Sequence, residues 1–297
     1  MIFVTGGTGF VGRSLIQQLN RLGIPVRILL RPTDRSPNLP RSLPVDVAIC
    51  TLQDQRGLKA ALKNVDTIFH LATDENRGTN ADLQGVNTEG TISLVQAALE
   101  SRVKHIVFLS HIGAAQASAY PLLKAKGISE NTIIKSGIPY TILRSSPIFG
   151  LNDHFTTPLA SLIQFSPLFF LVPGDGSTLL QPIYIDDLVN CLLWTLNEEQ
   201  LKNQVVPIGG AEYLSFTEIV KLILTTMKIK RILVNVNPAN LRILTMLLEH
   251  YYPKLHVSSL WLDYLSTDRI APLDTLPRLF NLIPARMNSN LSYLLES

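Results

Sequence analysis

The chain has 297 residues, a hydrophobic fraction of 46% and a formal net charge of +3 at pH 7. This length fits one large α/β domain or a domain with a smaller appendage, and the hydrophobic fraction suffices for a sizeable buried core. The composition argues against disorder, and the small charge, without a basic block interleaved with aromatic residues, excludes nucleic acid as the expected partner.

Short apolar runs alternate with helical patterns along the first half of the chain. Near-continuous apolar strands separated by helices are typical of a parallel sheet covered by helices on both faces, so we predict a doubly wound α/β fold. The predicted strands are Ile2–Val4, Val26–Leu30, Val45–Ile49, Thr67–Leu71, His105–Leu109 and Tyr140–Leu143. The predicted helices are Gly12–Leu22, Leu58–Leu62, Thr88–Glu100 and Leu122–Ser136.

A glycine-rich segment joins the first predicted strand to the first predicted helix. Gly6 permits a tight turn, Gly9 lets the backbone approach a pyrophosphate, and Gly12 lets the helix pack closely on the strand. The helix N-terminus then directs its N–H groups and positive dipole end at the anion. The pattern therefore predicts dinucleotide binding by Thr5, Gly6, Gly7, Thr8, Gly9, Phe10, Val11 and Gly12.

A competing interpretation of the same segment is the P-loop of nucleoside triphosphatases. The run from Gly7 to Gly12 is followed by Arg13 and Ser14, which nearly matches that motif. Arg13 stands where the motif requires a lysine that reaches the outer phosphates, and this argues against an NTPase.

Two arginines follow the second predicted strand. NAD-binding folds place an acidic residue there to hold the ribose hydroxyls, whereas this chain has Arg31, with Arg35 close behind. An arginine can receive the 2′-phosphate of NADP, so we expect NADP(H) to be preferred over NAD(H). The alternative is that both are ordinary solvated charges.

The pattern is less regular in the second half. We predict a dinucleotide-binding domain over 1–150, to which the chain returns around 180–210, and a smaller, mostly helical substrate or partner region over 151–297. Ser215 is expected to cap its helix with Glu218 three residues on. The predicted helices are Asp186–Leu196, Ser215–Met227 and Leu241–Leu248, and the predicted strands are Val205–Ile208 and Ile232–Val236.

One uncharged segment, Phe155–Gly174, is long enough to span a bilayer. Pro158, Pro167 and Pro173 interrupt it, so we expect a buried or substrate-facing helix and no transmembrane segment. Contact with a membrane surface stays an alternative. The chain opens without a signal peptide, so a cytoplasmic location is expected.

Further motifs occur in a consistent order along the chain. With the spacing Thr-Gly-x-x-Gly-x-x-Gly at residues 5–12, they resemble extended and atypical short-chain dehydrogenases/reductases over about residues 1–225. The subgroup most similar contains the Rossmann-fold accessory subunit of respiratory complex I, and NmrA-like and isoflavone-reductase-like proteins are more distant. The matching segments are Phe69–Ala72, Val86–Thr91, Ile106–Ser110, Tyr120–Lys124, Tyr140–Gly150 and Gln181–Asp187.

The segment Tyr120–Lys124 matches the catalytic Tyr-x-x-x-Lys pair of this family. Residues four apart share a helix face, and Pro121 is tolerated in a first turn. A tyrosine phenol can serve as general acid, with its pKa lowered by the lysine ammonium. The family's usual Ser or Thr is replaced by His111, so either His111 or Ser110 would orient the substrate carbonyl, or the chemistry has been lost.

The resemblance also implies further cofactor contacts near the ends of the later strands. Lys124 would bond the nicotinamide ribose as well as tune the tyrosine. One departure is Thr51, where many relatives carry an aspartate that contacts adenine. The other implied cofactor residues are Leu71, Ala72, Asn87, Ser145, Ser146, Pro147 and Ile148.

The remaining polar residues suggest no metal site. The histidines show no ligand spacing with carboxylates, and Asp186 and Asp187 fit the start of a helix, where the dipole favours acidic side chains. Cys50 and Cys191, each within an apolar run, are expected to be reduced core residues.

Two functions are compatible with these motifs. The first is NADPH-dependent reduction of a carbonyl or related group of an apolar small molecule, bound between the sheet's C-terminal edge and Ile148–Pro173. The second is a non-catalytic NADP(H)-binding accessory, assembly or redox-sensing protein with a protein partner. Tyr120 and Lys124 favour the first, and His111 favours the second.

Overall fold

The computed structural model describes residues 1–32, 44–252 and 260–295. The chain divides into two compact units. Unit 1 comprises residues 1–74, 82–144 and 189–206, and unit 2 comprises residues 75–81, 145–188 and 207–297. The functional division at residue 150 stays a prediction.

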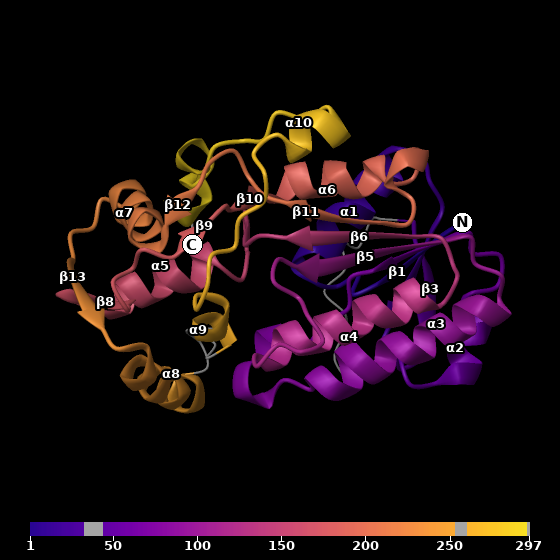
Figure 1. Cartoon of the computed structure of the whole chain (residues 1–297), viewed down its shortest axis with the longest axis horizontal. Coiled ribbons are helices and arrows are strands. Elements are labelled where there is room, and N and C mark those ends of the chain that lie inside the picture. Colours follow the sequence, from indigo (N-terminus) through magenta and orange to yellow (C-terminus); the bar gives the residue numbers. More distant parts are fainter. Residues whose placement is uncertain (33–43, 253–259, 296–297) are drawn as a thin grey trace. The chain divides into compact units, whose positions relative to one another are not determined.

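A seven-stranded sheet forms the centre of unit 1, in the order β11-β6-β5-β4-β1-β2-β3 (Figure 1). The adjacent pairs from β3 to β5 are parallel, with Thr5 opposite His70 at the ends of β1 and β4. The strand order reverses between β1 and β4, which is where such folds bind ligands. The strands are β1 (Ile2–Thr5), β2 (Val26–Leu30), β3 (Asp46–Ile49), β4 (Thr67–His70), β5 (His105–His111), β6 (Tyr140–Ser145) and β11 (Gln204–Ile208).

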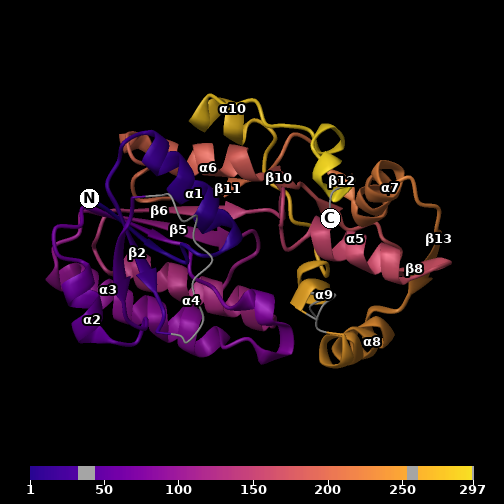
Figure 2. The same ribbon diagram turned by 180° about the vertical axis from the view of Figure 1, so that it is seen from behind.

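Helices cover both faces of this sheet, which confirms the predicted doubly wound α/β fold (Figures 1 and 2). Helices α2, α3 and α4 share one face with a common apolar core that includes Leu58, Leu94 and Ile133. Helix α1 lies on the opposite face. The helical elements of unit 1 are α1 (Phe10–Arg21), α2 (Gln55–Ala61), a π-helix η2 (Leu83–Glu89), α3 (Gly90–Glu100), α4 (Pro121–Lys135) and η3 (Glu199–Leu201).

Unit 2 is built from short strand pairs and helices around a second apolar core. The capping box predicted at Ser215 and Glu218 is confirmed at the start of α7. The strand pairs are β7 (Ile148–Phe149) with β10 (Ile183–Tyr184), β9 (Leu179–Leu180) with β12 (Leu214–Ser215), and β8 (Phe169–Pro173) with β13 (Ile232–Val236). The helices are η1 (Glu75–Asn80), α5 (Thr156–Phe165), α7 (Phe216–Thr226), α8 (Pro238–Tyr251), α9 (Leu260–Tyr264), α10 (Thr275–Phe280), η5 (Met287–Ser289) and η6 (Ser292–Leu295), while α6 (Ile185–Trp194) runs from unit 2 into unit 1.

The uncharged segment Phe155–Gly174 is not one helix, so the prediction of a buried or substrate-facing helix over the whole segment is wrong. Helix α5 ends at Phe165, and the chain then forms β8, whose parallel partner β13 lies some sixty residues further along the sequence. Among the described residues, no helix is both long and apolar enough to cross a membrane. Cys50 and Cys191 are buried and are not joined in a disulfide, as predicted.

Candidate cofactor site

The glycine-rich segment forms a tight turn between β1 and α1. Gly6 has φ +73°, in the left-handed region, and a Cβ on it would lie 2.7 Å from the carbonyl carbon of Leu71. The N–H of Gly9 donates to the carbonyl oxygen of Gly6 at 3.0 Å. The turn therefore requires glycine at residue 6, both for its backbone angle and for its close contact with the chain that leaves β4.

Helix α1 packs directly against the backbone of this turn. A Cβ on Gly12 would lie 2.2 Å from the carbonyl oxygen of Gly6 and 2.7 Å from the Cα of Gly7. Gly12 thus permits a close approach between α1 and the glycine-rich turn that follows β1, and not between α1 and β1 itself. Of the other loop residues, Gly7 and Phe10 are buried, and Thr8 and Val11 are half-buried.

The start of α1 has the properties of an anion site. Gly9 is its N-cap, no side chain caps the helix, and its first turn contains no acidic residue. Gly9 is exposed, and a Cβ there would meet only the carbonyl oxygen of Gly6, at 3.2 Å. An uncapped N-terminus with a bare, exposed backbone beside it fits the pyrophosphate of a dinucleotide.

A chain of buried hydrogen bonds joins the ends of β1 and β4 to α3. Oγ1 of Thr5 lies 2.7 Å from Nδ1 of His70, and Nε2 of His70 lies 2.9 Å from Oγ1 of Thr91. Thr91 donates its hydroxyl hydrogen to the carbonyl oxygen of Asn87 at 2.5 Å. His70 must therefore donate to Thr91, and Thr5 donates to His70. Thr5 also accepts the N–H of Ala72 at 3.2 Å, which fixes the backbone opposite the glycine turn.

This chain of bonds requires a neutral His70. Burial, reinforced by the nearby Lys126 ammonium, lowers the pKa of His70 to about 3. A neutral imidazole has one donor and one acceptor nitrogen, which is what Thr91 and Thr5 need from it.

Asn87 uses its side chain to hold the loop after β4. Its Nδ2 donates to Oγ1 of Thr73 at 3.0 Å, and its Oδ1 accepts the N–H of Asp74 at 3.3 Å. Its carbonyl oxygen also accepts the hydroxyl of Ser129 at 2.6 Å. The structure thus shows Asn87 positioning the loop beside the glycine turn, while its predicted cofactor contact stays a prediction.

The end of β2 brings a cation and a carboxylate together. Nη1 of Arg31 lies 3.8 Å from Oδ1 of the buried Asp74, although the Arg31 side chain is 61% exposed. Asp74 was missed in the sequence because it follows β4, far from Arg31 along the chain. Arg35, predicted as the second phosphate ligand, lies outside the described residues.

Two polar residues end β5. Ser110 is fully buried, and its hydroxyl has no hydrogen-bond partner among the described residues. His111 follows it and is half-buried. Buried hydroxyl groups in folded proteins nearly always have a hydrogen-bond partner. The unpaired hydroxyl of Ser110, at the end of a parallel strand, therefore fits a site that binds a polar group of a ligand.

The predicted Tyr–Lys pair lies at the start of α4. Tyr120 is the N-cap residue, with extended backbone angles, and Pro121 occupies the first turn as expected. Lys124 is exposed, and its N–H donates to the carbonyl oxygen of Tyr120 at 2.9 Å. A Cβ on Gly127 would lie 2.3 Å from the carbonyl carbon of Ala115, so α4 packs tightly against the segment that follows β5.

A second lysine on α4 was not recognised in the sequence. Lys126 is buried, donates from Nζ to the carbonyl oxygen of Leu109 at 3.0 Å, and lies 5.1 Å from the centre of the Phe108 ring. The pattern of apolar residues along α4 did not indicate a buried lysine, because this helix is covered on most sides and also buries Ser129 and Glu130. Lys126 therefore links α4 to β5, near Ser110.

The segment Ser145–Ile148 belongs to unit 2. The N–H of Ser146 donates to the carbonyl oxygen of Ile208 at 3.0 Å, and its hydroxyl donates to that of Gln181. The N–H of Ile183 donates to the carbonyl oxygen of Pro147 at 2.9 Å. These bonds fix the segment within unit 2, and its predicted cofactor contact stays a prediction.

Known sequences similar to this chain include an enzyme subunit, an assembly factor and a reductase. The chain is 24% identical over 231 residues to NADH dehydrogenase [ubiquinone] 1 alpha subcomplex subunit 9 of Arabidopsis thaliana, covering 74% of this chain and 56% of that protein. It is 26% identical to photosystem II assembly factor Ycf39 of Trieres chinensis (74% and 67%) and 27% identical to NAD(P)H azoreductase of Xenophilus azovorans (74% and 71%). The match thus spans little more than half of the Arabidopsis subunit.

Solved structures share the fold over nearly the whole chain. The NADPH-dependent quinone oxidoreductase QOR2 of Escherichia coli, solved with NADPH, superposes with a TM-score of 0.78 at 17% identity, covering 99% of both chains. A UDP-glucose 4-epimerase of Thermotoga maritima superposes with a TM-score of 0.73 at 19% identity, covering 99% of this chain and 97% of the epimerase.

A family model described as NAD(P)H-binding matches residues 6–158. This range begins within the glycine turn and includes His70, Asn87, Tyr120 and Lys124. From the turn at the β1–β4 reversal, the seven-stranded sheet and this match, the chain belongs to the NAD(P)H-binding family of Rossmann-fold proteins.

Proposed function

We propose that this chain is an NADP(H)-dependent oxidoreductase that reduces a carbonyl or related group of an apolar small molecule. Two features together carry the proposal. The first is the glycine turn at the strand-order reversal, followed by the uncapped N-terminus of α1, and the second is the pair Tyr120 and Lys124 at the start of α4. The similarity to proteins named as an azoreductase and a quinone oxidoreductase supports a reductase.

The residues of the site have distinct roles in this proposal. The bound cofactor supplies the hydride. Tyr120 would donate a proton to the reduced oxygen, and the Lys124 ammonium would bond the nicotinamide ribose. Ser110 or His111 donates a hydrogen bond that orients the substrate.

The preference for NADP(H) over NAD(H) is part of the same proposal. Arg31 is exposed and lies at the end of β2, where its guanidinium would receive the 2′-phosphate, with Arg35 as the second ligand. The Asp74 carboxylate pairs with Arg31 and would help to hold its guanidinium near the end of β2. A charge-assisted hydrogen bond contributes about 1.5–3 kcal/mol, so we expect a preference of about tenfold to a hundredfold.

Turnover of NADPH with a panel of apolar aldehydes, ketones, quinones and azo compounds tests the proposal. Tyr120→Phe should lower turnover about a hundredfold or more and leave NADPH affinity nearly unchanged, because the phenol acts only on the reacting group. Lys124→Ala should lower both, because the ammonium also bonds the cofactor. Lys135→Ala, an exposed lysine in the last turn of the same helix, is the matched control and should change neither.

A non-catalytic NADP(H)-binding protein is the second candidate function. The histidine at the position of the family's usual Ser or Thr favours it, as does the similarity to proteins named as a complex I subunit and an assembly factor. Such a protein would act through a protein partner, in the cytoplasm or at a membrane surface. If the wild-type protein oxidises no NADPH with any compound of the panel while binding it, this second function replaces the first.

A further inference from the structure

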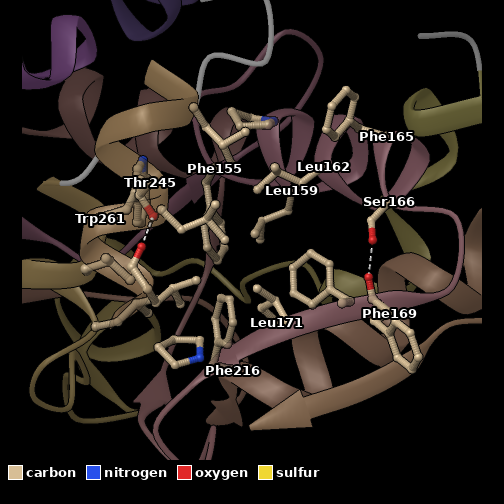
Figure 3. A pocket seen from close by; sticks show the side chains of 18 residues that line it. Phe155, Leu159, Leu162, Phe165, Ser166, Phe169, Leu171, Phe216, Thr245 and Trp261 are labelled. Carbon is tan, nitrogen blue, oxygen red and sulfur yellow. Dashed lines mark hydrogen bonds between the residues drawn. The ribbon is translucent and has the colours of Figure 1, made fainter. Parts of the chain in front are cut away.

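Unit 2 contains a cavity of about 270 Å³ with an almost entirely hydrocarbon wall. Figure 3 shows aromatic and leucine side chains directed into it from α5, β8 and the start of α9. Among the described residues that line it are Phe155, Leu159, Leu162, Leu171, Leu241 and Trp261. None of the described side chains that line it carries a charge.

The two hydroxyl groups among the described lining residues already have partners. Oγ1 of Thr245 donates to the carbonyl oxygen of Leu241 at 2.8 Å, and the hydroxyl of Ser166 donates to the carbonyl oxygen of Phe169. Each hydroxyl has a single hydrogen to donate, so neither offers one to a ligand. Polar groups are few in the described wall, so a charged or strongly hydrated head group would lose most of its water here without replacement, which favours hydrocarbon in the interior.

The size of the cavity suits a chain of several carbon atoms. Apolar cavities of about 150 Å³ stay dry and take up benzene, so a larger one with the same kind of wall favours hydrocarbon over water. Helix α8 lines one side and is apolar outside the cavity as well, since Ile243, Met246 and Leu247 are about half exposed or more. A hydrocarbon chain would therefore approach over an apolar surface.

We propose that unit 2 binds the hydrocarbon chain of an amphiphile, acyl or isoprenoid, in this cavity, with the polar head group in solvent. The site goes beyond the proposed reductase function, because chain binding requires neither NADPH nor turnover. Each methylene that enters the cavity should raise affinity about fourfold, until the chain reaches the end of the cavity.

Trp261 supplies a direct probe of the cavity. The chain has only two tryptophans, and Trp194→Phe leaves Trp261 as the single emitter. Titration of this variant with n-alcohols from hexanol to hexadecanol should give a saturable emission change whose affinity rises with length and then levels off. Farnesol and geranylgeraniol, titrated beside alcohols of equal chain length, show whether the cavity prefers a branched isoprenoid or a linear chain.

Two lysine substitutions on α8 separate the cavity from the outer surface of the helix. Leu241→Lys, at a residue that lines the cavity, should weaken binding of dodecanol at least tenfold, whereas Ile243→Lys, at an exposed residue outside it, should not. Leu159→Phe narrows the cavity without adding charge and should lower the affinity for the longest chains at least fivefold.

The thermal midpoint of each variant reports whether it is folded. No saturable emission change with any chain, no dependence on chain length, or equal losses in Leu241→Lys and Ile243→Lys would each overturn the proposal. Because no turnover is measured, its failure leaves the proposed reductase function untouched, and the converse also holds.

Discussion

Gly12 and Gly9 differ in what a side chain would meet, although both belong to the same motif. Alanine at residue 12 gains about 1 kcal/mol in helix propensity, but its Cβ would meet backbone at 2.2 Å. Overpacking against atoms that cannot rotate away costs about 1–3 kcal/mol or more. We therefore expect Gly12→Ala to lower the free energy of unfolding, by up to about 2 kcal/mol, in urea titrations.

Gly9→Val is the matched variant for that measurement. Its backbone angles, φ −75° and ψ 174°, suit any residue, and its nearest contact would be 3.2 Å. We expect a loss of about 1 kcal/mol or less, mainly because valine is a poor N-cap. If Gly9→Val destabilised the protein more than Gly12→Ala, the packing of helix against turn would be misassigned.

Some site residues could be predicted individually and others could not. The glycines, Tyr120 and Lys124 occupy fixed spacings in a local motif, so the sequence reveals them. Asp74 and Lys126 belong to no local motif, and each matters through a residue distant in the sequence, Arg31 for Asp74 and His70 for Lys126. Such partners become visible only when the sheet brings the strands together.

At the scale of elements, the hydrogen bonds of His70 join β1, β4 and α3 and make the free energy of unfolding depend on pH. In the unfolded chain histidine has a pKa of about 6.5, while in the folded protein the pKa of His70 is about 3. Between these values the unfolded state binds the extra proton, so stability is full above pH 6.5 and falls as the pH falls toward 3. From pH 7 to pH 5 the expected loss through His70 is about 2 kcal/mol.

Urea unfolding of wild type and His70→Gln at pH 7 and pH 5 measures this coupling. Glutamine does not titrate, so the variant should be less stable at pH 7 and lose about 2 kcal/mol less on acidification. The buried His105, whose pKa is also lowered, to about 4 by burial, keeps a residual dependence in both proteins. The exposed His250→Gln serves as the control. An identical pH dependence in wild type and His70→Gln would show that His70 is not held neutral.

Elements stabilised by local contacts were predictable, and those defined by distant ones were not. The alternation that gives β1 to β6 is local, and so is the capping box at Ser215. Helix α3 was expected from Thr88, but the chain first forms the π-helix η2 from Leu83, where the N-cap Asp82 accepts the N–H of Gly85, and α3 begins at Gly90. Strand β8 depends on β13, so no local pattern distinguishes it from a continuation of α5.

At the scale of the whole molecule, family and chemistry are separate questions. The fold is shared with an NADPH-dependent quinone oxidoreductase and a UDP-glucose 4-epimerase, and similar sequences include proteins named as an NADH dehydrogenase subunit and an assembly factor. In this fold a dinucleotide binds at the strand-order reversal, and function is added at sites on a common scaffold. The glycine turn is therefore the claim on which both proposed functions of this chain depend.

Calorimetric titration of the full chain with NADPH tests that claim most directly. The wild type should bind NADPH with a single site, and about tenfold to a hundredfold more tightly than NADH. Gly9→Val should remain folded and lose NADPH binding, because its side chain occupies the space through which the pyrophosphate reaches the start of α1. Unchanged NADPH affinity in folded Gly9→Val would contradict the account.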